Sequence, residues 1–467
     1  MLSKRLDIWL PTYMANAPRR ALQRVRRASQ HTHIIFLICD HFEPRHGADT
    51  EQAAQRMKTW RASYADFQQR CRKEFGKAPL HSWFYPPHHG TEHLAALSTM
   101  AHEGLGEVEL HYHHDGDTEA KLERDLRQTL AEYNRWGLLL ESGERPRASF
   151  GFVHGDWALC NSLDGKDKYC GVNNELNLLQ KLGCWADFTM PSGGPCQTRK
   201  INSIYYAGGD PRKPKSHDWG TDAQAGKPDA AGLMLMQGPM GINFSAPRYP
   251  RIENASLTSA NWGRPDRIRK WVDCNVHVRN RPEWVFVKLH THGAIEQDFD
   301  SLFGDKAMQM HRVLNQQYND GKRYSLHYAT ARQAFNVAKA AEHGHGGNPA
   351  DYFDFRIPLP ATSFYSADAR HVLEHCTSDR LVLSAIEQDR SVQIRTRLGP
   401  IASLRGPVSR YEIDVLRKLI HIEAGGMVEM AVRDNAPVDI VSGGVMKGGD
   451  GRLRQLEVSQ TCTLRYS

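Results

Sequence analysis

Short apolar runs and longer amphipathic runs alternate along most of the chain. Each apolar run has the length of a strand and ends in polar residues, and the amphipathic run after it repeats its apolar positions every three or four residues. In the run 118–137, for example, Leu122, Leu126, Leu130 and Tyr133 share one helical face. Such alternation predicts parallel strands joined by helices, as in an α/β sheet or barrel.

The apolar runs that predict strands lie at 33–40, 80–87, 107–114, 148–157, 184–192 and 283–293. The amphipathic runs that predict helices lie at 50–76, 91–104, 118–137, 174–183 and 329–342. Between the last two predicted strands, residues 207–232 are rich in glycine, proline and charge. We expect this segment to be a long insertion loop and a candidate lid.

The pattern changes after the glycine-rich segment 343–349. Short alternating runs such as RLVLSAI, SVQIRTRL and MVEMAVR follow, with turn residues between them. They predict a separate β-rich domain, sandwich-like in form. The expected organisation is therefore a basic N-terminal arm over 1–30, an α/β domain over 31–345 and the β-rich domain over 356–467.

The composition is typical of a soluble globular protein. Of the 467 residues, 40% are hydrophobic and 24% are charged, and no apolar run approaches the ~18–20 residues that cross a membrane. The N-terminus lacks the apolar core and cleavage site of a secretory signal, and the nine cysteines include no C-x-x-C pair. We therefore expect a cytoplasmic protein with reduced thiols. Four cysteines are too widely spaced to favour a zinc ribbon: Cys160, Cys170, Cys184 and Cys196.

Much of the net charge of +7 lies in the N-terminal arm. Its basic residues, opposed only by Asp7, are Lys4, Arg5, Arg19, Arg20, Arg24, Arg26 and Arg27. Because apolar and aromatic residues such as Trp9 and Tyr13 lie among them, the arm could make a peripheral contact with anionic lipid at the inner membrane face. It could equally pack on its own domain with its arginines in water. A nucleic-acid partner is not favoured, because no basic motif interleaved with aromatic residues occurs on a recognisable sheet.

Polar side chains with metal-binding capacity follow four of the predicted strands. They are Asp40, His41 and Glu43; His111, His113, His114 and Asp115; His154, Asp156 and Trp157; and His290 and His292. Each one alone could be a turn former or a hydrogen-bonded core residue. Together they predict a functional site, because the carboxyl ends of parallel strands meet at one face. Imidazole and carboxylate groups suit Zn²⁺ or a similar first-row ion, and so indicate metal-assisted hydrolysis.

Three stretches resemble motifs of the NodB-homology polysaccharide deacetylases. The residues ICDH at 38–41 are similar to the T-F-D-D motif of that family, EVELH at 107–111 to its second motif, and VKLH at 287–290 to its last. The resemblance covers about 31–345. It is closest to an intracellular branch associated with bacterial surface-polysaccharide clusters, which shares phrases such as FGFVHGDWAL, CGVNNEL and GCWADFTMPS. It implies a distorted β/α barrel.

The resemblance also implies roles for individual residues. Asp40 would be the general base and His290 the acid that protonates the leaving amine. The implied ligands of a divalent ion, most simply Zn²⁺ with Ni²⁺ or Co²⁺ as alternatives, are His41, His111 and His114. Residues expected at the substrate site are Glu43, Trp83, Tyr85, His154, Asp156 and Trp157. The three aromatic rings of that set could stack on a sugar or merely pack at the rim.

The sequence departs from the family pattern at three places. His41 stands where the family has a metal-binding aspartate. The second ligand histidine is expected at position 115, which is aspartate here, so His113, His114 and Asp115 remain alternatives with His114 preferred. The sequence HGDW at 154–157 replaces the motif that supplies an arginine to the family's base.

The implied activity is a metal-dependent hydrolase that removes an N-acetyl or similar acyl group from an amino sugar. Its substrate would be a cell-surface polysaccharide or a cytoplasmic precursor, in nucleotide-linked, lipid-linked or free oligosaccharide form. The alternative, supported by the motif departures, is a non-catalytic carbohydrate-binding protein on a degenerate barrel. Metal binding distinguishes the two, because a binding protein needs no open coordination position.

Overall fold

The computed structural model describes residues 4–144, 146–163, 167–247, 250–359, 362–365, 371–385, 392–449 and 452–467. The chain divides into two compact units. The first comprises Met1–Gly90, Gly104–Leu126 and Phe150–Ile357, and the second comprises Thr91–Glu103, Arg127–Ser149 and Pro358–Ser467. Every candidate site residue from the sequence belongs to the first unit.

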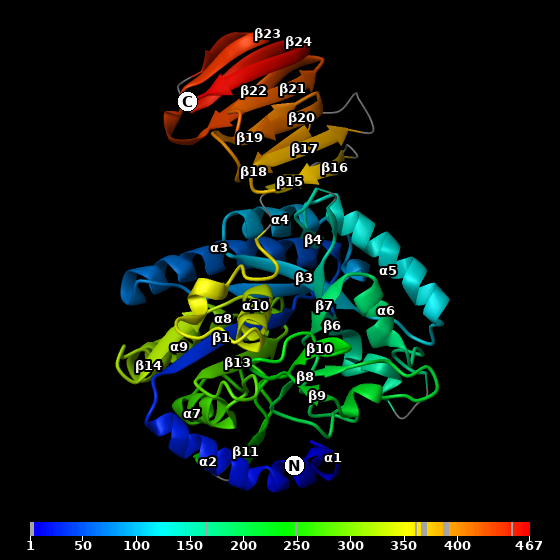
Figure 1. Cartoon of the computed structure of the whole chain (residues 1–467), viewed down its shortest axis with the longest axis vertical. Helices are drawn as coiled ribbons and strands as arrows, with labels where there is room; N and C mark the ends of the chain where they lie inside the picture. The colour runs from blue at the N-terminus through cyan, green and yellow to red at the C-terminus, as the bar shows by residue number, and fades with distance from the viewer. Residues whose placement is uncertain are drawn as a thin grey trace. The chain divides into compact units, whose positions relative to one another are not determined.

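The first unit is an α/β structure around a ten-stranded sheet, which confirms the predicted α/β class (Figure 1). Its parallel strands are β1 (Thr32–His41), β2 (His81–Tyr85), β3 (Gly106–Tyr112), β6 (Phe150–His154), β7 (Cys184–Asp187), β10 (Leu233–Met236), β13 (Trp284–Thr291) and β14 (Tyr324–Tyr328). Two antiparallel strands, β8 (Ile204–Ala207) and β9 (Thr221–Asp222), form one edge. The segment 207–232 therefore contains the short strand β9 and is not entirely loop.

The sheet curves around one apolar core. On β1, Ile35, Leu37 and Cys39 share this core with residues of β2, β6, β7, β8, β10 and β13. The described strands form an open path from β13 to β9. Backbone hydrogen bonds through the segment 276–279 span the opening, from Arg279 N–H to Ala223 O at 2.8 Å and from Phe286 N–H to Val276 O at 2.8 Å.

The other helices and short strands complete the two units. The helices are α3 (Thr50–Phe75), α4 (Leu94–His102), α5 (Glu119–Asn134), α6 (Glu175–Lys181), α7 (Pro265–Cys274), α8 (Phe299–Leu302) and α9 (Asp305–Tyr318), and the strands are β4 (Leu140–Glu141) and β5 (Arg147–Ala148). Helix α3 covers the face of β1 and β2 opposite the core, where the Trp60 ring lies 5.6 Å from that of Trp83. The sheet thus has an inner face and a helix-covered face.

Helix α10 (Ala331–Glu342) closes the inner core at the amino ends of the strands. It begins at a capping box formed by Thr330 and Gln333. The Ala331 N–H donates to Ser82 Oγ on β2 at 2.8 Å, and the buried Arg332 forms a bidentate ion pair with Glu107 on β3, at 3.0 and 2.8 Å. Because α10 covers the amino ends of the strands, the polar groups lie at the carboxyl ends.

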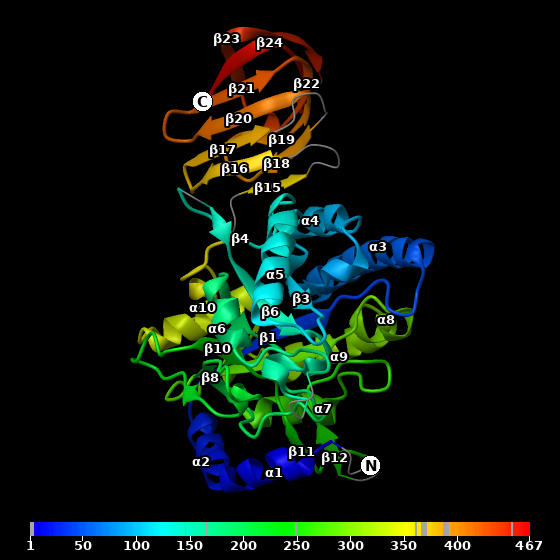
Figure 2. The same cartoon turned by 90° about the vertical axis from the view of Figure 1, so that its right-hand side faces the viewer.

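The N-terminal arm forms two helices, α1 (Leu6–Ala15) and α2 (Ala17–Ala28), beside β11 (Gly241–Asn243) and β12 (Arg251–Glu253) (Figures 1 and 2). Trp9 is fully buried, and with Tyr13 it forms an apolar cluster against the rest of the unit. Leu22 and Val25 on α2 are exposed. Across the residues described, none of the helices is both long enough and apolar enough to pass through a bilayer.

The second unit is built on a curled antiparallel sheet (Figure 2). Its strands are β15 (Thr362–Tyr365), β16 (His371–Cys376), β17 (Arg380–Ala385), β18 (Val392–Thr396), β19 (Ile401–Gly406), β20 (Val408–Asp414), β21 (Leu419–Ala424), β22 (Gly426–Val432), β23 (Val438–Gly449) and β24 (Leu453–Tyr466). The predicted β-rich character is confirmed, but these strands form one continuous sheet where the sequence predicts two packed ones. The alternate residues on its concave side enclose a core of their own.

Replacing Trp9 with alanine should lower the free energy of unfolding by about 3–5 kcal/mol, because it empties the centre of the contact between the arm and its unit. Denaturant unfolding of the full chain measures this change. The control is Val25→Ala on the neighbouring helix, whose side chain is 70% exposed and whose loss should cost no more than about 0.5 kcal/mol. Equal effects of the two substitutions would show that the arm is not docked.

Candidate functional site

The polar groups at the strand ends form two clusters on opposite faces of the sheet. Successive side chains of a strand point to opposite faces. At the end of β3, His111 and His113 therefore point inward, whereas His114 points to the helix-covered face. We call the inner cluster the set His41, Glu43, His111, His113, Trp157 and His292, and the outer cluster the set His114, His154, Cys170 and Glu175.

Glu43 is the carboxylate of the inner cluster. Its Oε1 lies 3.1 Å from Nε2 of His113 and 3.8 Å from Nε2 of His111, and its Oε2 lies 3.5 Å from Nε2 of His292. Burial alone would raise the pKa of Glu43. The hydrogen bond from His113 and the electrostatic interactions with His111 and His292 outweigh burial and hold that pKa well below its usual range. Glu43 is therefore an ionised carboxylate in a nearly dry setting.

His111 points an unprotonated ring nitrogen into the inner cluster. Its Nδ1–H donates to the Val153 carbonyl at 2.9 Å, so the unprotonated Nε2 faces Nε2 of His113 at 3.0 Å. Burial lowers the pKa of His111 to about 3, against the opposing effect of Glu43, and keeps the ring neutral. A ring whose far nitrogen is held by a carbonyl is the usual form of a metal-binding histidine.

His113 is oriented from both sides. Its Nδ1 lies 3.1 Å from Asp156 Oδ2, and its Nε2 lies 3.1 Å from Glu43. Burial lowers its pKa, but the hydrogen bonds to Asp156 and Glu43 are stronger and raise the pKa to about 9. The ring of His113 packs directly on Gly155, where a side chain would overlap it.

His41 contributes a neutral nitrogen without a partner. Its ring centroid lies 4.9 Å from that of His111, 5.0 Å from that of His292 and 5.4 Å from that of Trp157. Burial, together with His111 and His292, keeps the pKa of His41 well below its usual value. Its buried Nε2 has no hydrogen-bond partner among the described residues. A buried nitrogen without a partner, in a ring close to that of His111, fits a metal ligand.

Solvent reaches the inner cluster from one side. The side chains of His113 and His292 are 28% and 29% exposed, whereas Glu43, His41 and His111 are buried. His88, also exposed, extends this side, since its ring nitrogen lies within 4.8 Å of ligand atoms of Glu43 and His113. Catalytic metal sites combine buried ligands with one open direction in this way.

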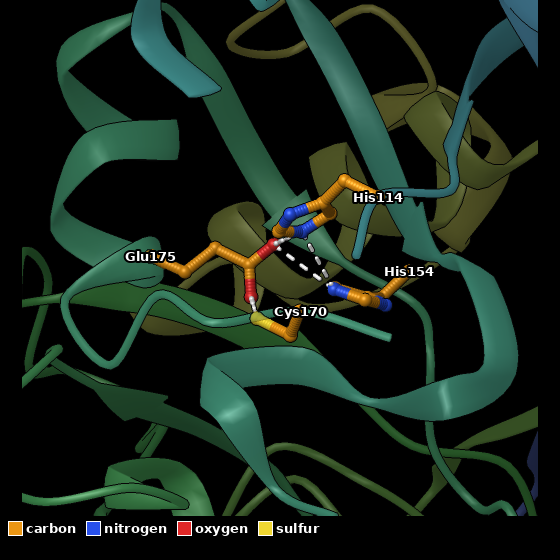
Figure 3. Close-up of side chains that lie close together, drawn as sticks. All are labelled: His114, His154, Cys170 and Glu175. Carbon is orange, nitrogen blue, oxygen red and sulfur yellow. Dashed lines mark hydrogen bonds and ion pairs between the residues drawn. The ribbon is translucent and has the colours of Figure 1, made fainter. Parts of the chain in front are cut away.

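The outer cluster is closed (Figure 3). Nε2 of His114 lies 3.0 Å from Nε2 of His154 and 3.2 Å from Glu175 Oε1, and Cys170 Sγ lies 3.6 Å from Glu175 Oε2. His154, Cys170 and Glu175 are fully buried, and the His114 side chain is 3% exposed. Burial lowers the pKa of His154 to about 4 although Glu175 opposes this, so the ring is neutral. These four groups could hold a metal ion.

The structure separates several residues that the sequence assigns to one site. His41, His111, Glu43, Asp156 and Trp157 come together, and His290 lies beside them with its ring 6.0 Å from that of His41. His114 and His154 belong instead to the outer cluster. His113 and His114 follow the last residue of β3 and continue its alternation, so His113, and not His114, joins His111.

Asp40 is not brought into the inner cluster. It points to the helix-covered face, where its Oδ1 accepts the Gly293 N–H at 2.6 Å and its Oδ2 lies 3.0 Å from His81 Nε2. Trp83 and Tyr85 lie on the same face and are fully buried. Neither ring therefore has a face open to a ligand.

Four groups in or beside the two clusters have no assigned role in the sequence-based prediction: His88, Cys170, Glu175 and His292. Cys170 and Glu175 stand five positions apart in CGVNNEL, a stretch that draws attention only through its resemblance to other sequences.

No protein-family model matches the chain, and a search of curated proteins finds no significant match. The resemblance to the deacetylases therefore stays a prediction.

Replacing Gly293 with alanine should lower the free energy of unfolding by about 1–3 kcal/mol, because the new methyl group would overlap the buried Asp40 carboxylate. Denaturant unfolding measures the effect. Gly194→Ala is the matched control, since the nearest atom to its added methyl group would be 4.0 Å away. Neither glycine has a positive φ, so the comparison isolates the steric overlap. Equal stability of the two variants would mean that Asp40 is not held against Gly293.

Proposed function

We propose that the protein is a metal-dependent hydrolase that removes an N-acetyl or similar acyl group from an amino sugar, on a distorted barrel of the deacetylase type. The observation that carries the proposal is the inner cluster. An ionised carboxylate, two neutral histidines with available lone pairs and a third histidine lie at the carboxyl ends of parallel strands, open to solvent on one side.

His41, His111 and His113 are the residues that would hold the ion. They fit Zn²⁺, because three imidazole ligands with an open direction are typical of catalytic zinc, and Ni²⁺ and Co²⁺ accept the same donors. His113, whose pKa is raised to about 9 in the metal-free protein, would release its Nε2 proton on binding the ion. When bound, the ion would act as a Lewis acid on the acyl carbonyl. It would also lower the pKa of a bound water molecule, so that this water can lose a proton near neutral pH. His113 keeps its place through Asp156, as metal-binding histidines generally do through a carboxylate.

Glu43 and His292 would move the proton. Glu43 is ionised and its Oε1 lies beside the ligand nitrogens, so it can accept a proton from the attacking water. His292 Nε2, 3.5 Å from the other carboxylate oxygen and partly exposed, can pass that proton to the leaving amine. These two residues take the roles that the resemblance implies for Asp40 and His290.

Asp40 acts in this proposal as a positioning residue. Its carboxylate receives the Gly293 N–H, and the Gly293 carbonyl accepts the Trp60 Nε1–H at 3.0 Å. The N–H and the carbonyl of Gly293, the residue directly after His292, are therefore both held by hydrogen bonds. Trp157, whose ring lies 6.0 Å from that of His292, is the aromatic residue best placed to pack on a sugar ring.

Glu43→Gln should lower the rate of acetate release by about 10²-fold or more, because it removes the proton acceptor and keeps the shape. The assay uses the metal-loaded full chain and a panel of N-acetylated amino-sugar oligosaccharides. The control is His421→Ala, an exposed histidine in the second unit whose loss should leave the rate unchanged.

Two outcomes would contradict the proposal. If Glu43→Gln hydrolyses substrate as fast as the unaltered chain, Glu43 is not the proton acceptor. If the loaded protein binds the oligosaccharides by calorimetry and hydrolyses none of them, the non-catalytic carbohydrate-binding function replaces the hydrolase.

A further inference from the structure

We infer that the outer cluster is a second metal site, with a structural role, that takes Zn²⁺ or a similar thiophilic first-row ion through His114, His154, Cys170 and Glu175. The inference does not depend on the proposed hydrolase. It concerns groups on the opposite face of the sheet from the inner cluster, with no open direction toward solvent.

Both imidazoles are oriented so that their Nε2 lone pairs converge. The His154 Nδ1–H donates to the carbonyl of Gly155, which leaves Nε2 unprotonated. His114 Nδ1 lies 3.4 Å from Asp117 Oδ2, and neither buried atom has a hydrogen-bond partner among the described residues. The neighbouring carboxylate favours a proton on that nitrogen. Carbonyl and carboxylate partners behind the ring are the usual supports of a metal-binding histidine.

The neutral rings can share a hydrogen bond only if the proton of His114 is on Nε2, which leaves the Nδ1 lone pair of that ring facing the Asp117 carboxylate at 3.4 Å. With both protons on Nδ1, two lone pairs face each other across the 3.0 Å that separate the Nε2 atoms. A proton placed between them would make a buried cation, which the dry surroundings disfavour. A metal ion placed among Nε2 of both rings and Glu175 Oε1 removes the repulsion.

Burial and Glu175 raise the pKa of the Cys170 thiol in the absence of a cation, but both the sulfur and the Glu175 carboxylate have backbone N–H groups that would stabilise negative charge once a cation is bound. Cys170 Sγ accepts backbone N–H groups from Asn161 at 3.2 Å and from Val172 at 3.4 Å, and Glu175 Oε2 accepts the Cys160 N–H at 2.7 Å. One thiolate and one carboxylate equal the charge of a divalent ion, so the filled site is neutral overall. A neutral site is what a buried position requires.

The donor set indicates the kind of ion and its role. Two nitrogens, a sulfur and an oxygen make a four-ligand set of the kind that tetrahedral zinc accepts, and closed four-ligand sites are structural. The ligands come from the ends of β3 and β6, from the segment after residue 167 and from the first residue of α6. An ion would therefore tie the ends of these two strands to the segment that leads into α6 and to the start of that helix.

Cobalt substitution tests the inference without any change to the chain. Cobalt bound to thiolate gives a near-ultraviolet charge-transfer band, whereas cobalt on nitrogen and oxygen ligands gives none, and the inner cluster contains no sulfur. We expect the full-length protein loaded with Co²⁺ to show this band. Cobalt binding without the band, or no cobalt binding at all, overturns the inference.

Substitutions then separate the two sites. The zinc-loaded chain should carry about two metal equivalents, and Cys170→Ser should carry about one, without the thiolate band. Cys71→Ser is the matched control. It replaces a buried cysteine on α3 that faces Met308 on α9, and the variant should keep both equivalents and the band. A Cys170→Ser variant with the same metal content and the same melting temperature as the control also overturns the inference.

The inner cluster is tested in parallel by His111→Ala, which should lose the other equivalent and keep the thiolate band. If the protein shows the thiolate band but releases no acetate, the outer site stands and the hydrolase proposal fails. Absence of the band in an active enzyme removes the outer site and leaves the hydrolase. The two proposals therefore fail through different measurements.

Discussion

The strict alternation of side chains along a strand is the constraint on which the chemistry of this protein depends. From His111 on β3 it continues into the two residues after the strand, so that His113 lies on the same face as His111 and His114 on the other. On β1 it sends His41 inward and Asp40 outward. A single dense stretch of histidines thereby supplies two chemically distinct clusters, one open to solvent and one closed. Any register slip of one residue would exchange their contents.

Burial sets the charge state of each cluster. The neutral rings of His41, His111 and His154 result from their dry surroundings, whereas His113 remains charged because Asp156 and Glu43 flank it. Each cluster also has a carboxylate beside its ring nitrogens, Glu43 in the inner cluster and Glu175 in the outer one. Uncharged nitrogen donors beside an ionised oxygen donor form a ready metal-binding arrangement, and the polar supports behind the rings fix its direction.

Much of the first unit could be predicted from the sequence, because most of its strands are short apolar runs and its helices are amphipathic. The runs at 33–40 and 283–293 match β1 and β13 closely. The site was predictable in location but less so in composition. Alternation by itself would have separated Asp40 from His41 and His113 from His114. Cys170 and Glu175 carry no such signal, because they reach the outer cluster through the chain path after β6.

The second unit illustrates a different limit. Its short alternating strands predict β structure, but each alternating run fits a sandwich and a single curled sheet equally well. Which strands pair is decided by contacts between distant runs, such as β22 with β24 and β17 with β20. Local periodicity carries no information about those pairs.

Gly155 stands between the two clusters and serves both. Its carbonyl accepts the Nδ1–H of His154 in the outer cluster, while its lack of a side chain admits the His113 ring of the inner one. One peptide unit thus belongs to two sites at once. The two sites are therefore constrained together in evolution. A side chain at this position would overlap the His113 ring of the inner site, and the resulting shift of the carbonyl would disturb His154 in the outer one.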